Sequence, residues 1–126
     1  MLVFKGRKPV RGGRRKIFVD SSALIDGRIL NVAKTGFIDG DLIILRGVLR
    51  ELQLLADNKD PERRLRGRTG LENASALERT LEVNTEIMDD GIEKAKVDDL
   101  LLVKAREYNG AVLTLDYNLI KVAETE

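Results

Sequence analysis

The sequence predicts an α/β fold with a mostly parallel central sheet. Short apolar runs alternate with helical patterns along the chain, and two of these runs lead directly into an aspartate. Strands that alternate with helices pair in parallel through crossover connections. The carboxyl ends of such strands meet at one edge of the sheet, where open α/β proteins bind their ligands. The sequence therefore also predicts where a functional site would lie.

The expected strands are short and rich in apolar residues. They run over residues 16–19, 42–45, 83–88 and 111–115. The expected helices carry apolar residues at helical spacing and are bounded by capping residues. They run over residues 23–34, 47–56, 69–81, 97–108 and 118–123. Gly36 and the Asn109–Gly110 pair follow two of these helices, where a positive φ commonly ends a helix. We expect a turn at residues 89–91 and a polar break at residues 57–66.

The composition is typical of one soluble globular domain, since 43% of the 126 residues are apolar and 34% are charged. Residues 1–15 lack periodicity and are expected to form a flexible basic arm, followed by the domain over residues 16–126. Residues 1–16 hold seven of the 22 Lys and Arg residues and no acid, which leaves 15 basic against 21 acidic residues in the rest. The arm is either a solvated tail or a tether for nucleic acid or anionic lipid headgroups.

The chain contains no histidine and no cysteine. This excludes a Ser-His-Asp triad, a cysteine nucleophile and a zinc site built from thiolates or imidazoles. Any chemistry would then rest on carboxylates, which favour hard cations such as Mg²⁺ or Mn²⁺. The lack of cysteine suits a reducing cytoplasm, and no apolar run approaches the roughly 18 residues that span a bilayer.

Five acidic residues are candidates for such a site, and each has a purely structural alternative. Asp20 and Asp116 end apolar strands, but they also suit a helix N-cap and a turn. Glu51 has only non-polar neighbours three and four residues away, so it either binds a cation or reaches water from the edge of an apolar stripe. Asp98 and Asp99 begin a helix, where acids favour the helix dipole, and spacing does not separate the two.

Four segments together resemble a PIN domain, a nuclease fold. They are Val19–Gly27 (VDSSALIDG), Val48–Leu52 (VLREL), Val97–Leu101 (VDDLL) and Thr114–Leu119 (TLDYNL). The segments 20–30, 65–72 and 116–123 are most similar to the bacterial branch in which a PIN domain is joined to a TRAM domain. The resemblance covers about residues 16–124.

The resemblance implies a three-layer α/β/α sandwich around a sheet of about five strands, with an acidic pocket at its carboxyl edge. It implies a Mg²⁺- or Mn²⁺-dependent nuclease acting on single-stranded nucleic acid, usually RNA. The implied catalytic and metal-binding acids are Asp20, Glu51, Asp98 and Asp116. Family alignment favours Asp98 over Asp99. The supporting positions are Ser22, Asp26 and Asn118.

Members of this branch often have membrane helices before the PIN domain and a TRAM domain after it. The resemblance thus implies that this chain is cytoplasmic, or the cytoplasmic part of a membrane-anchored protein whose longer chain includes those segments. It also implies a homodimer or higher oligomer, which is common among PIN domains. No small-molecule organic cofactor is expected.

Four arginines near the polar break are candidate contacts for a phosphate backbone, with a solvated loop as the alternative: Arg63, Arg64, Arg66 and Arg68. With three Phe and two Tyr in the whole chain, little base stacking is expected. The main alternative to a nuclease is a catalytically silent module that binds RNA or protein, or that oligomerises. A phosphate-receiving signalling domain is disfavoured, because it needs a second acid beside Asp20 and a lysine at the end of a late strand.

Overall fold

A computed structural model describes residues 14–90 and 96–125. Its centre is a parallel sheet of four strands in the order β3-β2-β1-β4. The strands are β1 (Lys16–Val19), β2 (Asp41–Leu45), β3 (Asn84–Met88) and β4 (Ala111–Leu113). The α/β class and parallel pairing are thus confirmed. The sheet has four strands within the described residues, as the sequence pattern predicts, and not the five that the resemblance implies.

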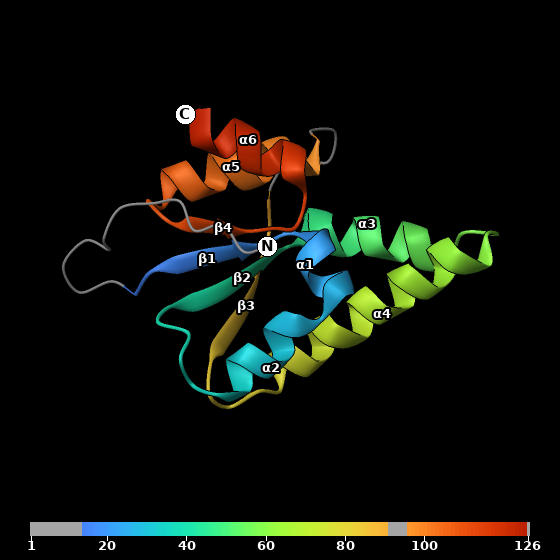
Figure 1. Ribbon diagram of the computed structural model, residues 1–126, viewed down its shortest axis with the longest axis horizontal. Helices are drawn as coiled ribbons and strands as arrows, with labels where there is room; N and C mark the ends of the chain where they lie inside the picture. The colour runs from blue at the N-terminus through green and yellow to red at the C-terminus, as the bar shows by residue number, and fades with distance from the viewer. Residues whose placement is uncertain (1–13, 91–95, 126) are drawn as a thin grey trace.

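Helices cover the sheet on two sides (Figure 1). They are α1 (Ser21–Asp26), α2 (Arg28–Lys34), α3 (Arg46–Ala56), α4 (Pro61–Glu78), α5 (Val97–Glu107) and α6 (Tyr117–Thr125). The first four lie together on one side, and α5 and α6 lie on the other. The chain steps outward from β1 to β3 and then returns past β1 to β4, so its direction in the sheet reverses between β1 and β4. Ligand sites of open α/β sheets form at such a reversal.

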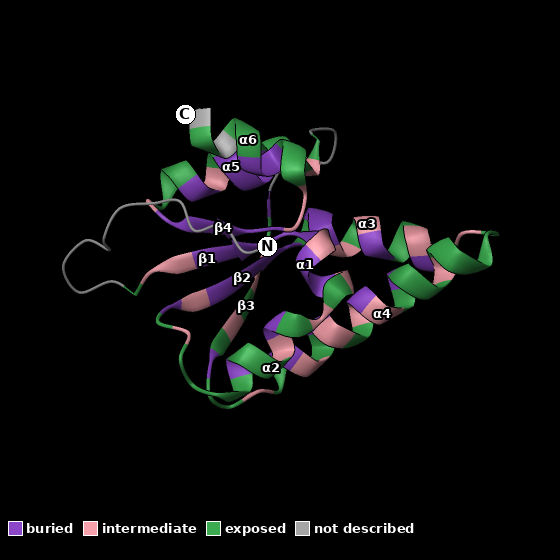
Figure 2. Ribbon diagram, viewed as in Figure 1, coloured by how far each residue is buried: buried purple, intermediate pink, exposed green. Residues whose placement is uncertain are grey.

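The core lies between the sheet and these helices (Figure 2). Every residue of β4 is buried, as are all but the first residue of β1 and of β2, which makes these strands nearly continuous apolar runs. Such runs are typical of parallel strands covered on both faces. The two edge strands differ, since β3 is only partly buried whereas β4 is fully buried. The buried core of the fold therefore lies on the two central strands, β1 and β2, and on the edge strand β4.

Two of the predicted helix boundaries are wrong. The single helix expected over residues 23–34 is two helices, because Gly27 adopts φ 82° and ends α1. The helix expected from residue 69 begins at Pro61, inside the expected polar break. Asp60 is its N-cap, and the Asp60 carboxylate accepts a hydrogen bond from the backbone N–H of Arg63. A capping Asp before a Pro is a known helix start, but the lack of apolar periodicity after it masked the signal.

Glycine explains why the start of α4 lacks an apolar stripe. Gly67 is buried where α4 crosses α3, and a Cβ there would lie 2.6 Å from the Leu52 carbonyl oxygen. The two helices approach closely because this residue has no side chain. The close contact holds α3 and α4 as a hairpin that projects from the sheet (Figure 1).

Most of the basic arm expected over residues 1–15 lies outside the described residues, as does Gly91 of the expected turn. Where the description begins, Arg14 Nε lies 3.3 Å from Asp41 Oδ1. None of the helices in the described ranges is long and apolar enough to cross a membrane.

Candidate active site

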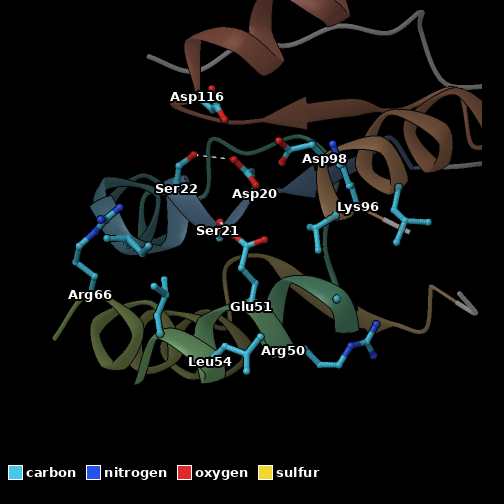
Figure 3. A pocket seen from close by; sticks show the side chains of 15 residues that line it. Asp20, Ser21, Ser22, Arg50, Glu51, Leu54, Arg66, Lys96, Asp98 and Asp116 are labelled. Carbon is cyan, nitrogen blue, oxygen red and sulfur yellow. Dashed lines mark hydrogen bonds between the residues drawn. The ribbon is translucent and has the colours of Figure 1, made fainter. Parts of the chain in front are cut away.

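A pocket of about 750 Å³ opens at the carboxyl ends of β1 and β4 (Figure 3). The predicted acids Asp20, Glu51, Asp98 and Asp116 all line it, as do Ser22 and Arg66. They come from the ends of two strands and from helices α1, α3, α4 and α5. Residues almost 100 positions apart in the sequence thus face one cavity. Between the two acids at the start of α5, the pocket selects Asp98, because Asp99 is not part of its lining.

Asp20 is the most buried of the four acids, with 3% exposure. Its Oδ2 accepts hydrogen bonds from Ser22 Oγ and Thr114 Oγ1, each at 2.8 Å. Asp20 occupies the N-cap position of α1 but makes no side-chain capping bond. The carboxylate is therefore turned towards β4 and the pocket, and the capping alternative does not describe its role.

Thr114 is a site residue that the sequence reasoning missed. It is 1% exposed, and its hydroxyl also accepts the backbone N–H of Asp116 at 3.0 Å. The strand register explains the contact with Asp20, since Val19 pairs with Leu113 and the next residues of the two strands are Asp20 and Thr114. A hydroxyl two residues before a strand-end acid was the available signal. Thr114 links the two strand-end acids.

Asp116 is half-buried at the pocket and also closes a local turn, because its Oδ1 accepts the backbone N–H of Asn118 at 2.9 Å. The turn alternative and a place in the pocket therefore coexist at this residue. Asn118 is exposed and does not line the pocket, so the structure gives its side chain no place there.

Glu51 is half-buried on α3, and its Oε1 accepts a hydrogen bond from Ser21 Oγ at 2.7 Å. Ser21 is itself buried at the start of α1 and is a second site residue that the sequence reasoning missed. The bond joins α3 to α1 across the pocket floor. Glu51 is thus held inside the pocket by a hydroxyl, and the alternative in which it only reaches for bulk water does not describe its position.

Asp98 differs from the other three acids in its surroundings. The residue is exposed as a whole, but its carboxylate points towards Asp20 in the pocket (Figure 3). Partial burial of this carboxylate raises its pKa to about 6, and repulsion from Asp20, Asp116 and Glu51 adds to the rise. A raised pKa from converging negative charge marks a place where a cation would be favourable.

A divalent cation fits the chemistry of this donor set. Within residues 14–90 and 96–125, no three acidic side chains already stand close enough to hold an ion. The four carboxylates nevertheless face one cavity, offer only oxygen donors and repel one another at Asp98. Hard cations such as Mg²⁺ and Mn²⁺ prefer oxygen ligands and relieve this repulsion. The residues that would hold the ion are Asp20, Asp98 and Asp116, with Glu51 beside them.

Basic side chains also line the same pocket, namely Arg50, Arg66 and Lys96. Of the four arginines proposed as phosphate contacts, Arg66 alone belongs to the lining. All four lie on the helix α4 and not in a loop. Residues three or four positions apart share a helix face, so Arg63 shares a face with Arg66, and Arg64 with Arg68.

Asp26 lies at the end of α1, outside the pocket lining. Its carboxylate accepts hydrogen bonds from the backbone N–H of Arg28 at 3.1 Å and from Arg28 Nε at 2.8 Å. These contacts lower the pKa of Asp26, chiefly through the side-chain hydrogen bond. The structure therefore gives this predicted supporting acid a local role at the α1–α2 junction.

The chain is similar to curated bacterial proteins described as uncharacterized PIN and TRAM-domain containing proteins. It is 40% identical over 109 residues to one from Bacillus subtilis, which covers 86% of this chain and 30% of that protein. It is 39% identical over 113 residues to one from Thermus thermophilus, which covers 90% of this chain and 32% of that protein. It is 42% identical over 109 residues to one from Synechocystis, which covers 86% of this chain and 30% of that protein. The chain therefore spans about a third of the length of these relatives.

A solved structure has the same fold. It is a domain of a functionally unknown protein from Methanocaldococcus jannaschii, with a TM-score of 0.70, 25% sequence identity, and coverage of 88% of this chain and 85% of that one. No family model matches the chain. The parallel α/β fold and the three relatives agree with the resemblance drawn from the sequence, and the chain belongs to the PIN-domain family, in its PIN–TRAM branch.

Proposed function

We propose that this domain is a Mg²⁺- or Mn²⁺-dependent nuclease that hydrolyses phosphodiester bonds of single-stranded nucleic acid, with RNA as the expected substrate. The observation that carries the proposal is the meeting of four carboxylates and three basic side chains in one pocket. Carboxylates alone would repel a phosphodiester. Basic side chains beside them attract the backbone and leave the carboxylates available for a cation.

The four acids have distinct tasks in this proposal. Asp20, Asp98 and Asp116 hold the cation, and Glu51 completes the site or orients the attacking water. A bound cation would supply a water of lowered pKa and would stabilise charge on the phosphate oxygens. Ser21 keeps Glu51 turned into the pocket, and Thr114 with Ser22 keeps the Asp20 carboxylate in place before substrate arrives. Such pre-organisation lowers the cost of reaching the productive geometry.

The substrate side of the proposal rests on charge and shape. The pocket is open and is flanked by the projecting α3–α4 hairpin, which carries Arg66. An unpaired strand can bend into a pocket of this kind, whereas a stacked duplex keeps its phosphodiesters on a regular helix. With few aromatic residues in the chain, we expect recognition of the backbone with little sequence preference.

The test is cleavage of a labelled single-stranded oligoribonucleotide with Mn²⁺ or with EDTA. The wild-type chain should cleave with Mn²⁺ and stop with EDTA. Asp20→Asn should slow cleavage by about 100-fold or more, which corresponds to roughly 2.7 kcal/mol of transition-state stabilisation. Asp26→Asn is the matched control, because it removes an acid of the same helix region that lies outside the pocket.

Cleavage by Asp20→Asn at the wild-type rate would contradict the assignment of this acid. Strand binding without any metal-dependent cleavage by the wild-type chain would instead favour the silent binding module, the alternative that the sequence leaves open.

A further inference from the structure

A buried carboxylate lies beneath the start of α3 and has no part in the function proposed above. It belongs to Asp90, two residues beyond the end of β3, and its side chain is only 1% exposed. Asp90 Oδ2 accepts the backbone N–H of Gly47 at 2.7 Å, and Arg50 Nη2 lies 3.2 Å from each carboxylate oxygen. The sequence pattern predicts only a turn at this residue. A buried charge needs such partners, and both of them line the acidic pocket.

Asp90 takes the place of a missing helix cap. The N-cap residue of α3 is Leu45, whose side chain has no hydrogen-bond acceptor. A Cβ at Gly47 would lie 2.5 Å from Asp90 Oδ2, so the absence of a side chain lets the helix start rest directly on the carboxylate. The orientation of α3, which also carries Glu51, is thus fixed from β3.

The contact also constrains Arg50 while leaving it accessible. The Arg50 side chain is 47% exposed, although its partner is buried. Asp90 engages the single nitrogen Nη2, and a guanidinium has five N–H donors in all. Arg50 can therefore donate to a second anion without leaving Asp90. In Figure 3, Arg50 and Arg66 lie on opposite sides of the carboxylates.

We propose that Arg50 contacts the phosphate backbone of a strand bound in this pocket and that Asp90 is its positioning residue, so that the strand crosses the carboxylates between Arg66 and Arg50. The proposal rests on the nuclease function proposed above and adds the path of the substrate. The Arg50 and Arg66 guanidinium groups, one on each side of the carboxylates, would hold the phosphates that flank the scissile phosphate. Because Asp90 already immobilises the Arg50 side chain, little conformational entropy is lost when the strand binds.

The test is the affinity for a short labelled oligouridylate, measured by fluorescence anisotropy in Ca²⁺ over a range of salt concentrations. Arg50→Ala should weaken binding roughly fivefold and reduce the slope of log K against log[salt] by about 0.7, the value for one phosphate contact on a single strand. Arg46→Ala is the matched control. It removes the same charge one turn earlier on α3, from a residue outside the pocket lining.

A double-mutant cycle tests the positioning role. Asp90→Asn keeps an acceptor for the Gly47 N–H but loses the charge that holds Arg50, so we expect roughly threefold weaker binding. In the Arg50→Ala background the same change should have no effect on binding. The R50A/D90N variant also removes the buried unpaired charge, so it supplies a folded reference if Arg50→Ala is unstable.

Two results would overturn the inference while the proposed function stands. One is strand binding in which Arg50→Ala changes the salt slope no more than Arg46→Ala does. The other is an equal effect of Asp90→Asn with and without Arg50, which would make Asp90 only a structural residue. If the wild-type chain neither binds nor cleaves the strand, the proposed function fails and this inference fails with it.

Discussion

The strand side and the helix side of the acidic pocket are built differently. On the strand side, Asp20 and Asp116 follow β1 and β4, and the hydroxyls of Thr114 and Ser22 connect them. On the helix side, Glu51 of α3 accepts a hydrogen bond from Ser21 Oγ, whereas Asp98 of α5 is exposed. Partial burial and repulsion from the other acids raise the pKa of the Asp98 carboxyl group to about 6.

This difference separates two tasks that a metal site must combine. Hydrogen bonds on the strand side orient its carboxylates before a cation arrives. The helix side contributes Asp98, whose charged carboxylate is unfavourable in free energy. A bound cation would offset this unfavourable energy. We therefore expect mutations on the strand side to damage geometry, and mutations on the helix side to change the pH dependence of metal binding.

Among the changes that test this contrast between the two sides, Thr114→Val should have the largest effect, because it removes the hydroxyl between the two strand-end acids. The buried Asp20 carboxylate loses a donor, and the backbone N–H of Asp116 loses an acceptor. We expect the free energy of unfolding to fall by about 1–3 kcal/mol and the Mn²⁺ affinity to fall at least roughly tenfold. Chemical denaturation and calorimetry measure the two quantities.

Thr80→Val is the control for that variant. It removes a hydroxyl that donates to the Ala76 carbonyl oxygen at 2.8 Å, and neither residue lines the pocket. If Thr114→Val and Thr80→Val lowered stability equally and left Mn²⁺ affinity unchanged, the strand side would not be pre-organised as described.

The second prediction concerns pH and Asp98. Its pKa lies above the ordinary value of 3.8, so the carboxyl group is largely protonated at pH 5 and largely charged at pH 7. Cation binding needs the charged form, so Mn²⁺ affinity should rise about tenfold between these two pH values. Without metal, the stability of the fold should change in the opposite direction. The charged form of Asp98 is unfavourable in the folded chain, so this group lowers the free energy of unfolding as the pH rises towards 6.

Asp98→Asn is the measurement that isolates this effect. The variant should bind Mn²⁺ more weakly, with a flat affinity between pH 5 and pH 7. A wild-type affinity that is equally flat in this window would show that Asp98 is not part of the cation site.

The smallest predicted effect separates the two faces of α4. Arg66 lines the pocket, and Arg63 lies on the same face of α4. Arg64 and Arg68 share a different face. We expect R63A/R66A to weaken binding of a single-stranded oligoribonucleotide roughly fivefold and R64A/R68A to leave it nearly unchanged. Equal losses from both pairs, measured by anisotropy, would indicate general charge attraction instead of a defined path.

The acids that line the pocket could be predicted from the strands and motifs to which they belong. Asp20 and Asp116 end buried strands, and the four segment motifs place Glu51 and Asp98 beside them. The hydroxyls Ser21 and Thr114 could not be predicted as partners, because their roles depend on strand register and on the packing of α1 against α3. Residue type alone does not encode such three-dimensional contacts.

The α3–α4 hairpin shows a second limit of sequence patterns. Helix α4 packs through the small residues Gly67 and Gly70, so the apolar periodicity that marks a helix is absent there. Asp90 was likewise hidden, because its partners Gly47 and Arg50 lie about 40 residues away in the sequence. Close backbone approach and long-range capping are properties of the folded chain, so local sequence patterns do not predict them.

The most direct test of the central claim is Mn²⁺ binding by calorimetry at pH 7. We propose that carboxylates from both sides of the pocket form one divalent-cation site. The wild-type chain and Asp26→Asn should bind Mn²⁺ alike, whereas Asp20→Asn combined with Asp116→Asn should abolish binding. Binding that persists in this double variant at wild-type affinity, or no binding by the wild-type chain at millimolar metal, would contradict the account.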